Sequence, residues 1–388
     1  MLRFITAGES HGPELVAVIE GAPAGFDIDI ARINHDLARR QKGYGRGGRM
    51  AIEKDEARIV SGIRFGRTMG SPVTFIVENR DFKNWEKRMS ADPRDRAEAK
   101  VVTRPRPGHA DLAGVLKYNL EDIRDVLERA SARETTARVA IGAFARQLIA
   151  PFGVQVVGYV VSIGSVVANV PPNIPIAELT RVTEQSQVRV ADAAAEQAII
   201  AEIDDCKKEG DTLGGIVEVI AVGLPVGLGS HVQWDRKLDG RLAHALLSLQ
   251  AVKGVEVGIG FEAARVRGSQ LHDEIGYDRE LRHFTRHSNN SGGTEGGMST
   301  GEPLRVRVAF KPLSTLMRPL KSADIKSKAE AVGAIERSDV CAIPAAAVIA
   351  ETVVAFELAN AFLEKFGGDS LAEITRNYQG YLEQVRNF

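Results

Sequence analysis

Two histidines of this sequence lie beside glycine, in the segments GESHG at residues 8–12 and RPRPGHAD at residues 104–111. Glycine leaves the neighbouring backbone and imidazole uncovered, and imidazole, with an ordinary pKa of about 6.5, transfers protons near neutrality. Either histidine alone is equally well interpreted as a turn residue bonded to the backbone. Together, His11 and His109 indicate an acid–base site.

A cluster of cations lies in RRQKGYGRGGR at residues 39–49, which holds five cations, four glycines and no acid. Guanidinium forks bind pairs of phosphate or carboxylate oxygens, and glycine lets backbone N–H groups approach the same anion. A solvated basic loop is the commoner explanation of such a charge run, but the glycine spacing favours an anion site. The segment lacks the Walker A pattern of nucleotide-binding loops.

Further segments carry weaker signals. In ERASARETT at 128–136, Ser131 is placed to cap a helix and Glu134 to complete a capping box, and the same helix N-terminus beside arginines would also attract phosphate. The other segments are SGGTEGGMS at 291–299, whose bare backbone suits a flat ligand, KPLST at 311–315, with a cation and two hydroxyls, and ERSD at 336–339.

The elements that must position these segments do not alternate regularly. Apolar runs predict strands at 16–19, 73–77 and 154–161. Periodicity predicts helices at 31–41, 112–128, 135–149, 193–208, 237–252, 325–332, 344–366 and 371–388. Long glycine-rich loops at 42–50 and 287–303 are expected to be either functional or disordered. Without a βαβ alternation, an α+β fold in a single domain over residues 1–388 is preferred to a doubly wound sheet.

Composition excludes several partners. Fifty basic against 51 acidic residues give a formal net charge of -1, and aromatic residues make up 6%, so we expect no nucleic acid partner. We find no apolar run of the roughly 18 residues that a membrane helix needs.

Cys206 and Cys341 lie far apart, which predicts reduced thiols. Without HExxH or CxxC patterns we expect no metal, and without a signal peptide a cytoplasmic protein.

Eight segments in a fixed order span residues 8 to 346, most of the chain. They are GESHG, GYGRGGRM, RPGHAD, ERASARET, LQAVKGVEVGIGFEAARVRGSQ, SGGTEGGMSTGEP, KPLST and ERSDVCAIPAA. Together they resemble the chorismate synthase family. The resemblance implies conversion of 5-enolpyruvylshikimate 3-phosphate to chorismate and phosphate, a 1,4-elimination that needs reduced FMN and ends the shikimate pathway of aromatic amino-acid biosynthesis. It also implies a homotetramer whose helices are sandwiched between antiparallel β-sheets.

The resemblance carries residue roles onto matching positions. His11 is expected to protonate the leaving phosphate, His109 to stabilise the negatively charged ring of reduced FMN, and Asp339 to assist proton removal. The implied cofactor contacts are Arg129, Ala130, Ser131, Gln250, Ala251, Gly296, Lys311, Pro312, Leu313, Ser314, Thr315 and Arg337.

The ligand of the arginines and the source of reduced flavin each have two alternatives. Arg40, Arg46 and Arg49 suit the phosphate and carboxylates of the substrate, but the positions of Arg40 and Arg46 are also associated with the nicotinamide nucleotide NADPH. Reduced flavin comes either from the chain itself or from a separate flavin reductase with NADPH as indirect reductant, and the length of 388 residues favours the second. A flavin reductase alone is the rival function, although no GxGxxG fingerprint lies between a strand and a helix.

Overall fold

The computed structural model describes residues 1–47, 53–98, 100–280, 282–336 and 338–388. Two antiparallel sheets carry the longer strands. The first has the order β1 (Arg3–Ala7), β2 (Glu14–Glu20), β6 (Val73–Glu78), β3 (Ala57–Ser61). The second has the order β10 (Val252–Val257), β15 (Leu304–Phe310), β9 (Gly215–Val222), β7 (Gln155–Ile163), β8 (Val166–Val167).

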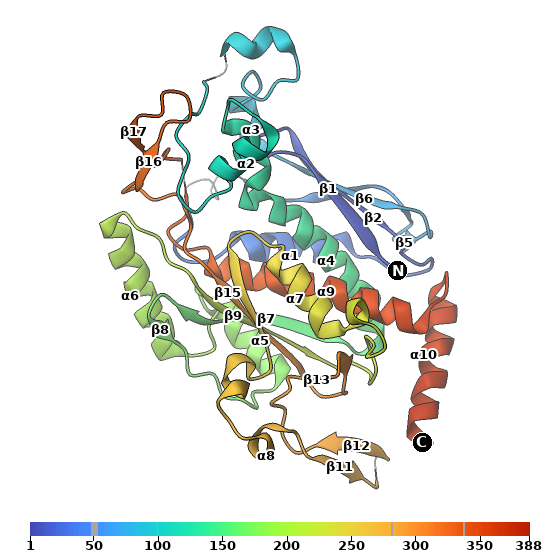
Figure 1. Cartoon of the computed structure of the whole chain (residues 1–388). Helices are drawn as coiled ribbons and strands as arrows, with labels where there is room; N and C mark the ends of the chain where they lie inside the picture. The colour runs from blue at the N-terminus through green and yellow to red at the C-terminus, as the bar shows by residue number, and fades with distance from the viewer. Residues whose placement is uncertain (48–52, 99, 281, 337) are drawn as a thin grey trace.

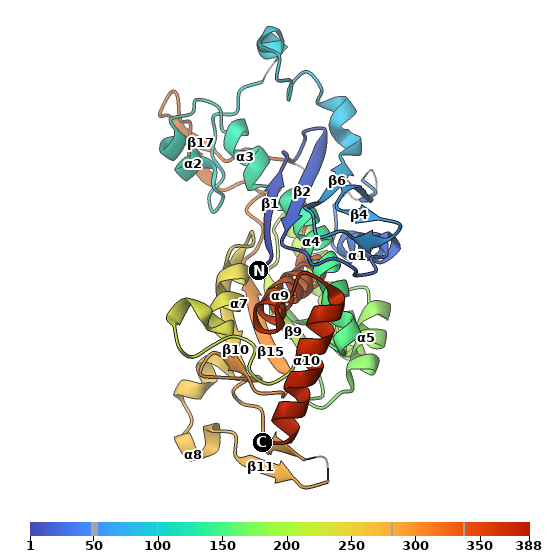
Figure 2. The same ribbon diagram turned by 90° about the vertical axis from the view of Figure 1, so that its right-hand side faces the viewer.

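Four two-stranded hairpins in the described part of the chain extend from this framework. They are β4–β5 (Ile63–Arg64, Arg67–Thr68), β11–β12 (Ile275–Asp278, His283–Arg286), β13–β14 (Thr294–Glu295, Met298–Ser299) and β16–β17 (Lys321–Ala323, Glu330–Val332). The β11–β12 hairpin lies at one end of the molecule, and the segment after β6 lies at the other (Figure 2).

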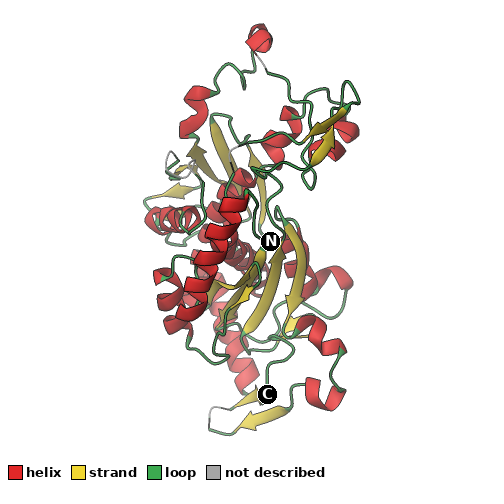
Figure 3. Ribbon diagram, turned by 90° about the vertical axis from the view of Figure 1, so that its left-hand side faces the viewer, coloured by secondary structure: helices red, strands yellow, loops and turns green. Residues whose placement is uncertain are grey.

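The central layer is helical (Figures 1 and 3). Helix α4 (Thr135–Ile149) contacts the first sheet, α9 (Ile343–Phe366) contacts the second, and α1 (Ile30–Gln41) packs on both helices. The two central helices are in close contact. A Cβ added at Gly142 in α4 would lie 2.1 Å from the carbonyl oxygen of Thr352 in α9. Only glycine fits at this crossing.

The apolar pattern explains why these elements assemble. In β2, Leu15, Ala17 and Ile19 are buried and alternate with more exposed residues, the period of a strand with one face on a core. Helix α9 is instead buried on nearly all sides, as expected for a helix that is apolar all round.

Among the described helices, α9 alone has the length and composition to span a membrane, with a mean hydropathy of 1.7 over its most apolar window. The helix was predicted at 344–366, but its length and composition were not recognised as those of a possible membrane span. Since 94% of that window is buried inside the fold, α9 is the core helix between the layers.

The other helices are α2 (Asp111–Tyr118), α3 (Arg124–Ala130), α5 (Ile176–Gln185), α6 (Ala193–Glu209), α7 (Leu238–Leu247), α8 (Gly268–Leu271) and α10 (Leu371–Arg386). The predicted α+β class with antiparallel sheets is confirmed. The helices predicted at 31–41, 135–149, 193–208, 344–366 and 371–388 and all three predicted strands are found within a few residues.

Three helix predictions are wrong in part or whole. The helix predicted at 112–128 is two helices, because Asn119 adopts a left-handed conformation with φ 54° and ends α2. The helix predicted at 237–252 ends at Leu247. Residues 325–332 form a turn and strand β17, since the Asp324 side chain accepts hydrogen bonds from the backbone N–H groups of Lys326 and Ser327.

The two loops predicted to be functional or disordered are described to different extents. The first is described only as far as residue 47, and the second contains the β13–β14 hairpin. Arg39, in the cationic segment, belongs to the last turn of α1 and makes a bidentate ion pair with Glu351 of α9 at 2.7 and 2.9 Å. This buried pair ties α1 to the core, so Arg39 does not serve an anion site.

Candidate functional site

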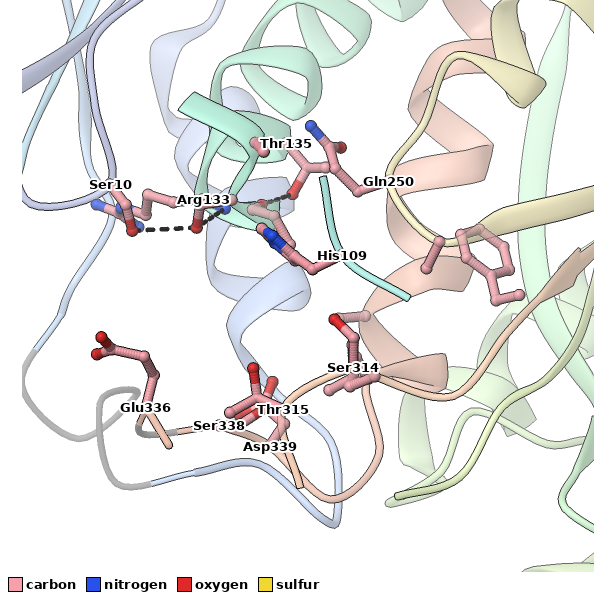
Figure 4. A pocket seen from close by; sticks show the side chains of 18 of the residues that line it. Ser10, His109, Arg133, Thr135, Gln250, Ser314, Thr315, Glu336, Ser338 and Asp339 are labelled. Atoms are coloured by element: carbon pink, nitrogen blue, oxygen red, sulfur yellow. Dashed lines mark hydrogen bonds between the residues drawn. The ribbon is translucent and has the colours of Figure 1, made fainter. Parts of the chain in front are cut away.

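A cavity of about 730 Å³ lies where the N-terminal ends of α4 and α9 meet the C-terminal end of α1. Its walls also include the β1–β2 loop, the loop before α2, and the segments after α7 and β15. Figure 4 shows His109 between one row that contains Ser10, Arg133 and Thr135 and a second group that contains Thr315 and Asp339. Helix N-termini favour anions, so the architecture suits a negatively charged ligand.

His11 is held by a carboxylate and an indole. Its Nδ1 lies 2.9 and 3.0 Å from the two carboxylate oxygens of Glu128, and its backbone N–H donates to Oε2 at 2.8 Å. The ring of Trp85 stacks on the imidazole with centroids 3.9 Å apart. Burial would raise the pKa of Glu128, but hydrogen bonds from His11 and Arg124 lower it below its ordinary value. Because Nδ1–H of His11 donates to Glu128, Nε2 is the ring nitrogen that can exchange a proton with a ligand.

His109 is held in the same way by Asp111. Nδ1 of His109 donates to Oδ1 of Asp111, and Arg106 donates to both carboxylate oxygens at 2.9 and 3.1 Å. Arg106 also donates to the Thr315 hydroxyl at 2.9 Å. Burial would raise the pKa of Asp111, but the bonds from His109 and Arg106 lower it far below its ordinary value. Gly108, with φ +79°, provides the left-handed turn before His109.

Arg40 and Arg133 present two buried guanidinium groups that share the carboxylate of Asp55. Arg40 also donates to the Thr135 hydroxyl at 3.0 and 2.9 Å. Burial lowers the pKa of Arg40 to about 9 and Arg133 adds to this, while Asp55 opposes it, so Arg40 stays charged at neutral pH. Nη2 of Arg133 is buried without a hydrogen-bond partner among the described residues, and its contact with Glu53 is 3.7 Å long.

Arg46 and Asp339 lie together on the same cavity wall. Nε of Arg46 is 3.3 Å from Oδ2 of Asp339, and the Gly47 N–H donates to Oδ1 at 2.6 Å. The predictions for Arg49 and Arg337 lie outside the described residues.

The predicted cofactor positions divide into two groups. Those on the cavity wall are Ala130, Ser131, Gln250, Ala251, Lys311, Leu313, Ser314 and Thr315. Within the described wall, Arg129, Gly296 and Pro312 are not among the lining residues. Arg129 instead donates to the carbonyl oxygens of Thr6 and Gly8 at 2.8 and 3.1 Å, and Gly296 lies in the turn of the β13–β14 hairpin.

Ser131 caps the turn before α4, as predicted, since its hydroxyl accepts from the Arg133 N–H at 3.2 Å. The predicted capping box is wrong, because the Glu134 carboxylate accepts from Thr6 and Gln250 instead. The Ser131 hydroxyl also donates to that of Ser10 at 3.0 Å.

The lining residues fit a flavin. Oε1 of Gln250 is buried and has no hydrogen-bond partner in the described part of the chain, so an acceptor is available to a ring N–H. Apolar side chains of Leu249 and Phe310 lie on the same wall, beside the hydroxyls of Ser314 and Thr315. Over the described ranges, no group of three or more His, Cys, Asp and Glu is arranged to hold a metal ion.

Three residues that hold the two histidines were given no role from the sequence, namely Trp85, Arg106 and Glu128, and Arg133 was included only as one of the arginines beside the predicted helix N-terminus. Arg106 and Asp111 are both within the motif around His109, so an ion pair between them could have been predicted from the sequence. Glu128 and Arg133 lie in ERASARETT, but nothing in the sequence pairs Glu128 with a histidine 117 residues away. Trp85 lies outside every recognised motif.

Comparison with known proteins identifies one family. The sequence profile of the chorismate synthase family matches residues 2–363. The chain is 59% identical to the chorismate synthase of Symbiobacterium thermophilum over 99% of both chains, and 58% identical to that of Geobacter sulfurreducens over 100% of both. A crystal structure of chorismate synthase matches with a TM-score of 0.81 at 41% identity, covering 100% of this chain and 99% of that one. The predicted activity, that of a lyase that forms chorismate, is confirmed. The chain belongs to the chorismate synthase family.

Proposed function

We propose that the cavity binds 5-enolpyruvylshikimate 3-phosphate together with reduced FMN and eliminates phosphate from the substrate. The observation that carries the proposal is the grouping of four guanidinium groups and two carboxylate-bound histidines around one cavity. The guanidinium groups belong to Arg40, Arg46, Arg106 and Arg133. A substrate with one phosphate and two carboxylates needs several such cations.

The substrate's anions are assigned first to Arg40, Arg46 and Arg133. Nη2 of Arg133 has no hydrogen-bond partner in the described part of the chain, and the buried Arg40 keeps its charge beside it. These residues share a wall with His11, so we assign Arg40 and Arg46 to the substrate rather than to NADPH. Arg49 belongs to the same basic segment and is proposed to contribute to the same site.

His11 is proposed to be the proton donor. In the elimination the ring C–O bond breaks and phosphate leaves with its electron pair, a ring hydrogen leaves as a proton, and a new C=C bond forms without net redox change. Glu128 binds Nδ1 of His11 and orients the imidazole, so that Nε2 is directed to protonate the departing phosphate.

Reduced FMN, when bound, supplies electron density to the substrate during the elimination. The chain's own residues hold it: Gln250 offers an acceptor, and Ser131, Ser314 and Thr315 offer hydroxyls. His109, held by Asp111, would stabilise the negative charge of the reduced flavin ring. Asp339, beside Arg46, is proposed to assist removal of the ring proton.

The remaining features expected of the family are proposed as well. These are a homotetramer, a cytoplasmic location, a single domain, and supply of reduced flavin by a separate reductase with NADPH as the indirect reductant. We further propose that the layer order of sheet, helices and sheet is the family's β-α-β sandwich, on the basis of the contacts of α4 and α9.

Paired substitutions test the histidine roles. His11→Ala and His109→Ala should each lower turnover by about 10²–10⁴-fold, the usual loss of an acid–base group. His35→Ala is the control, because that side chain is 67% exposed and lies away from the cavity wall. Wild-type turnover in either folded active-site variant would contradict the proposal.

A further inference from the structure

Trp85 covers the face of the proposed proton donor. The indole and the His11 imidazole are inclined by 26° with centroids 3.9 Å apart, which is a stacked arrangement, and both side chains line the cavity. Glu128 binds the same imidazole at its Nδ1 edge. A hydrogen bond at one edge leaves a ring able to tilt about that bond, whereas a second ring stacked on its face removes the tilt.

The chain around Trp85 fixes the indole itself. Trp85 follows the 3₁₀ helix Arg80–Asn84, and its backbone N–H donates to the carbonyl oxygen of Phe82 at 2.6 Å. Its indole N–H donates to Oδ2 of Asp81 at 3.3 Å. Asp81 is buried and also accepts from the Asn84 side chain at 2.8 Å. The indole therefore has a defined orientation before any ligand enters.

Arg124 connects the two groups that hold His11. Its guanidinium carbon lies 5.1 Å from the centroid of the Trp85 ring, and its Nη1 donates to Glu128 at 3.2 Å. Arg88 lies over the same indole at 5.6 Å. These cations attract the π-face of the indole and keep it against the site.

From this arrangement we infer that Trp85 is a positioning residue for the elimination: it fixes the plane of the His11 ring so that Nε2 is directed at the leaving phosphate. The inference rests on the role proposed above for His11. Because misplacing a catalytic group by about 1 Å costs up to roughly 10²-fold in rate, loss of the stacked ring should act on kcat.

Substitution of Trp85 separates positioning from binding. Trp85→Ala should lower kcat by about 10–10²-fold while KM for 5-enolpyruvylshikimate 3-phosphate changes by less than about threefold. Trp85→Phe keeps an aromatic face and should restore kcat to within about threefold of wild type. Trp234→Ala is the matched control, since the other tryptophan of the chain is 78% exposed and does not line the cavity.

Emission of Trp85 provides a readout that does not depend on turnover. The chain has two tryptophans, so Trp234→Phe leaves Trp85 as the sole indole emitter. A stacked imidazole quenches indole emission, and we expect His11→Ala in that background to remove the quenching and brighten the emission.

The outcomes distinguish the inference from the proposed function. Wild-type turnover in His11→Ala would overturn the role of His11 itself. If His11→Ala loses turnover but Trp85→Ala does not, only the inference on Trp85 is wrong. Unchanged Trp85 emission on removal of His11, or a folded Trp85→Phe as slow as Trp85→Ala, would also overturn it.

Discussion

One carboxylate fixes both the side chain and the backbone of a histidine: Nδ1 of His11 lies 2.9 Å from Oε1 of Glu128, and the His11 N–H donates to Oε2. The two residues are 117 positions apart, so helix α3 must dock against the β1–β2 loop before the pair exists. His109 meets Asp111 in the same way within one turn. The site thus contains two imidazoles whose Nδ1 atoms are committed to carboxylates.

Glu128→Gln should lower turnover by about 10–10²-fold, because the amide no longer presents two acceptor oxygens that hold the Nδ1–H and the backbone N–H of His11. Steady-state phosphate release measures the effect. Glu121→Gln, at an exposed position before α3, is the control. Equal turnover in the two variants would show that the ion pair has no catalytic role.

Asp111→Asn should reduce the free energy of unfolding at pH 7 by about 3 kcal/mol, since it breaks a buried ion pair with Arg106. The lowered pKa of Asp111 means that its contribution is present above the unfolded-state value of about 3.9 and is lost as the pH falls towards its folded value. Urea unfolding should therefore show a deficit that is constant near neutrality and shrinks below about pH 4.

The control for that comparison is Asp369→Asn, at an exposed position before α10. It should leave the free energy of unfolding within about 0.5 kcal/mol of wild type. A deficit in Asp111→Asn that grows on acidification would contradict the assigned charge state.

Gly142→Ala should destabilise the fold by about 1–3 kcal/mol, because the new methyl group would meet the Thr352 carbonyl oxygen where α4 crosses α9. Gly380→Ala is the matched substitution in α10, where no atom lies within 4 Å, and should stabilise by about 0.5–1 kcal/mol. Chemical denaturation measures both. If both substitutions change the free energy of unfolding in the same direction, the close contact between α4 and α9 is contradicted.

Gln250→Ala should weaken FMN binding about tenfold, the equivalent of one lost hydrogen bond, because Oε1 of Gln250 is the buried acceptor without a partner among the described residues. Flavin fluorescence titration with substrate present gives the dissociation constant. Gln384→Ala, exposed on α10, should have no effect. An unchanged dissociation constant in Gln250→Ala would show that FMN does not bind to Gln250.

Helices were predicted well from the sequence where the apolar periodicity extended over several turns and a capping residue marked the helix end. The helix at 135–149 was predicted with the bounds of α4, in an alanine-rich run that follows the Ser131 cap. The prediction at 325–332 covered about two turns, too few for periodicity to outweigh the Asp324 turn and the pairing of β17 with β16. The break between α2 and α3 was marked by Asn119, which ends α2, and by Asp122, whose side chain accepts from the Arg124 N–H at the start of α3.

Within the site, motifs identified residues but not their partners. His11, His109, Arg40, Arg46 and Asp339 all reach the cavity wall. Glycine spacing pointed to most of them, because backbone that approaches a ligand needs residues without Cβ. Partners from distant segments depend on tertiary packing, which no local pattern encodes. Trp85 is such a residue, since its contact with His11 exists only once the segment after β6 folds over the β1–β2 loop.

The most direct test of the account is anaerobic phosphate release from 5-enolpyruvylshikimate 3-phosphate with dithionite-reduced FMN, beside an oxidised-FMN control. We expect equal amounts of phosphate and chorismate with reduced flavin and neither product with oxidised flavin. No turnover by soundly folded protein, or equal turnover with oxidised flavin, would contradict it.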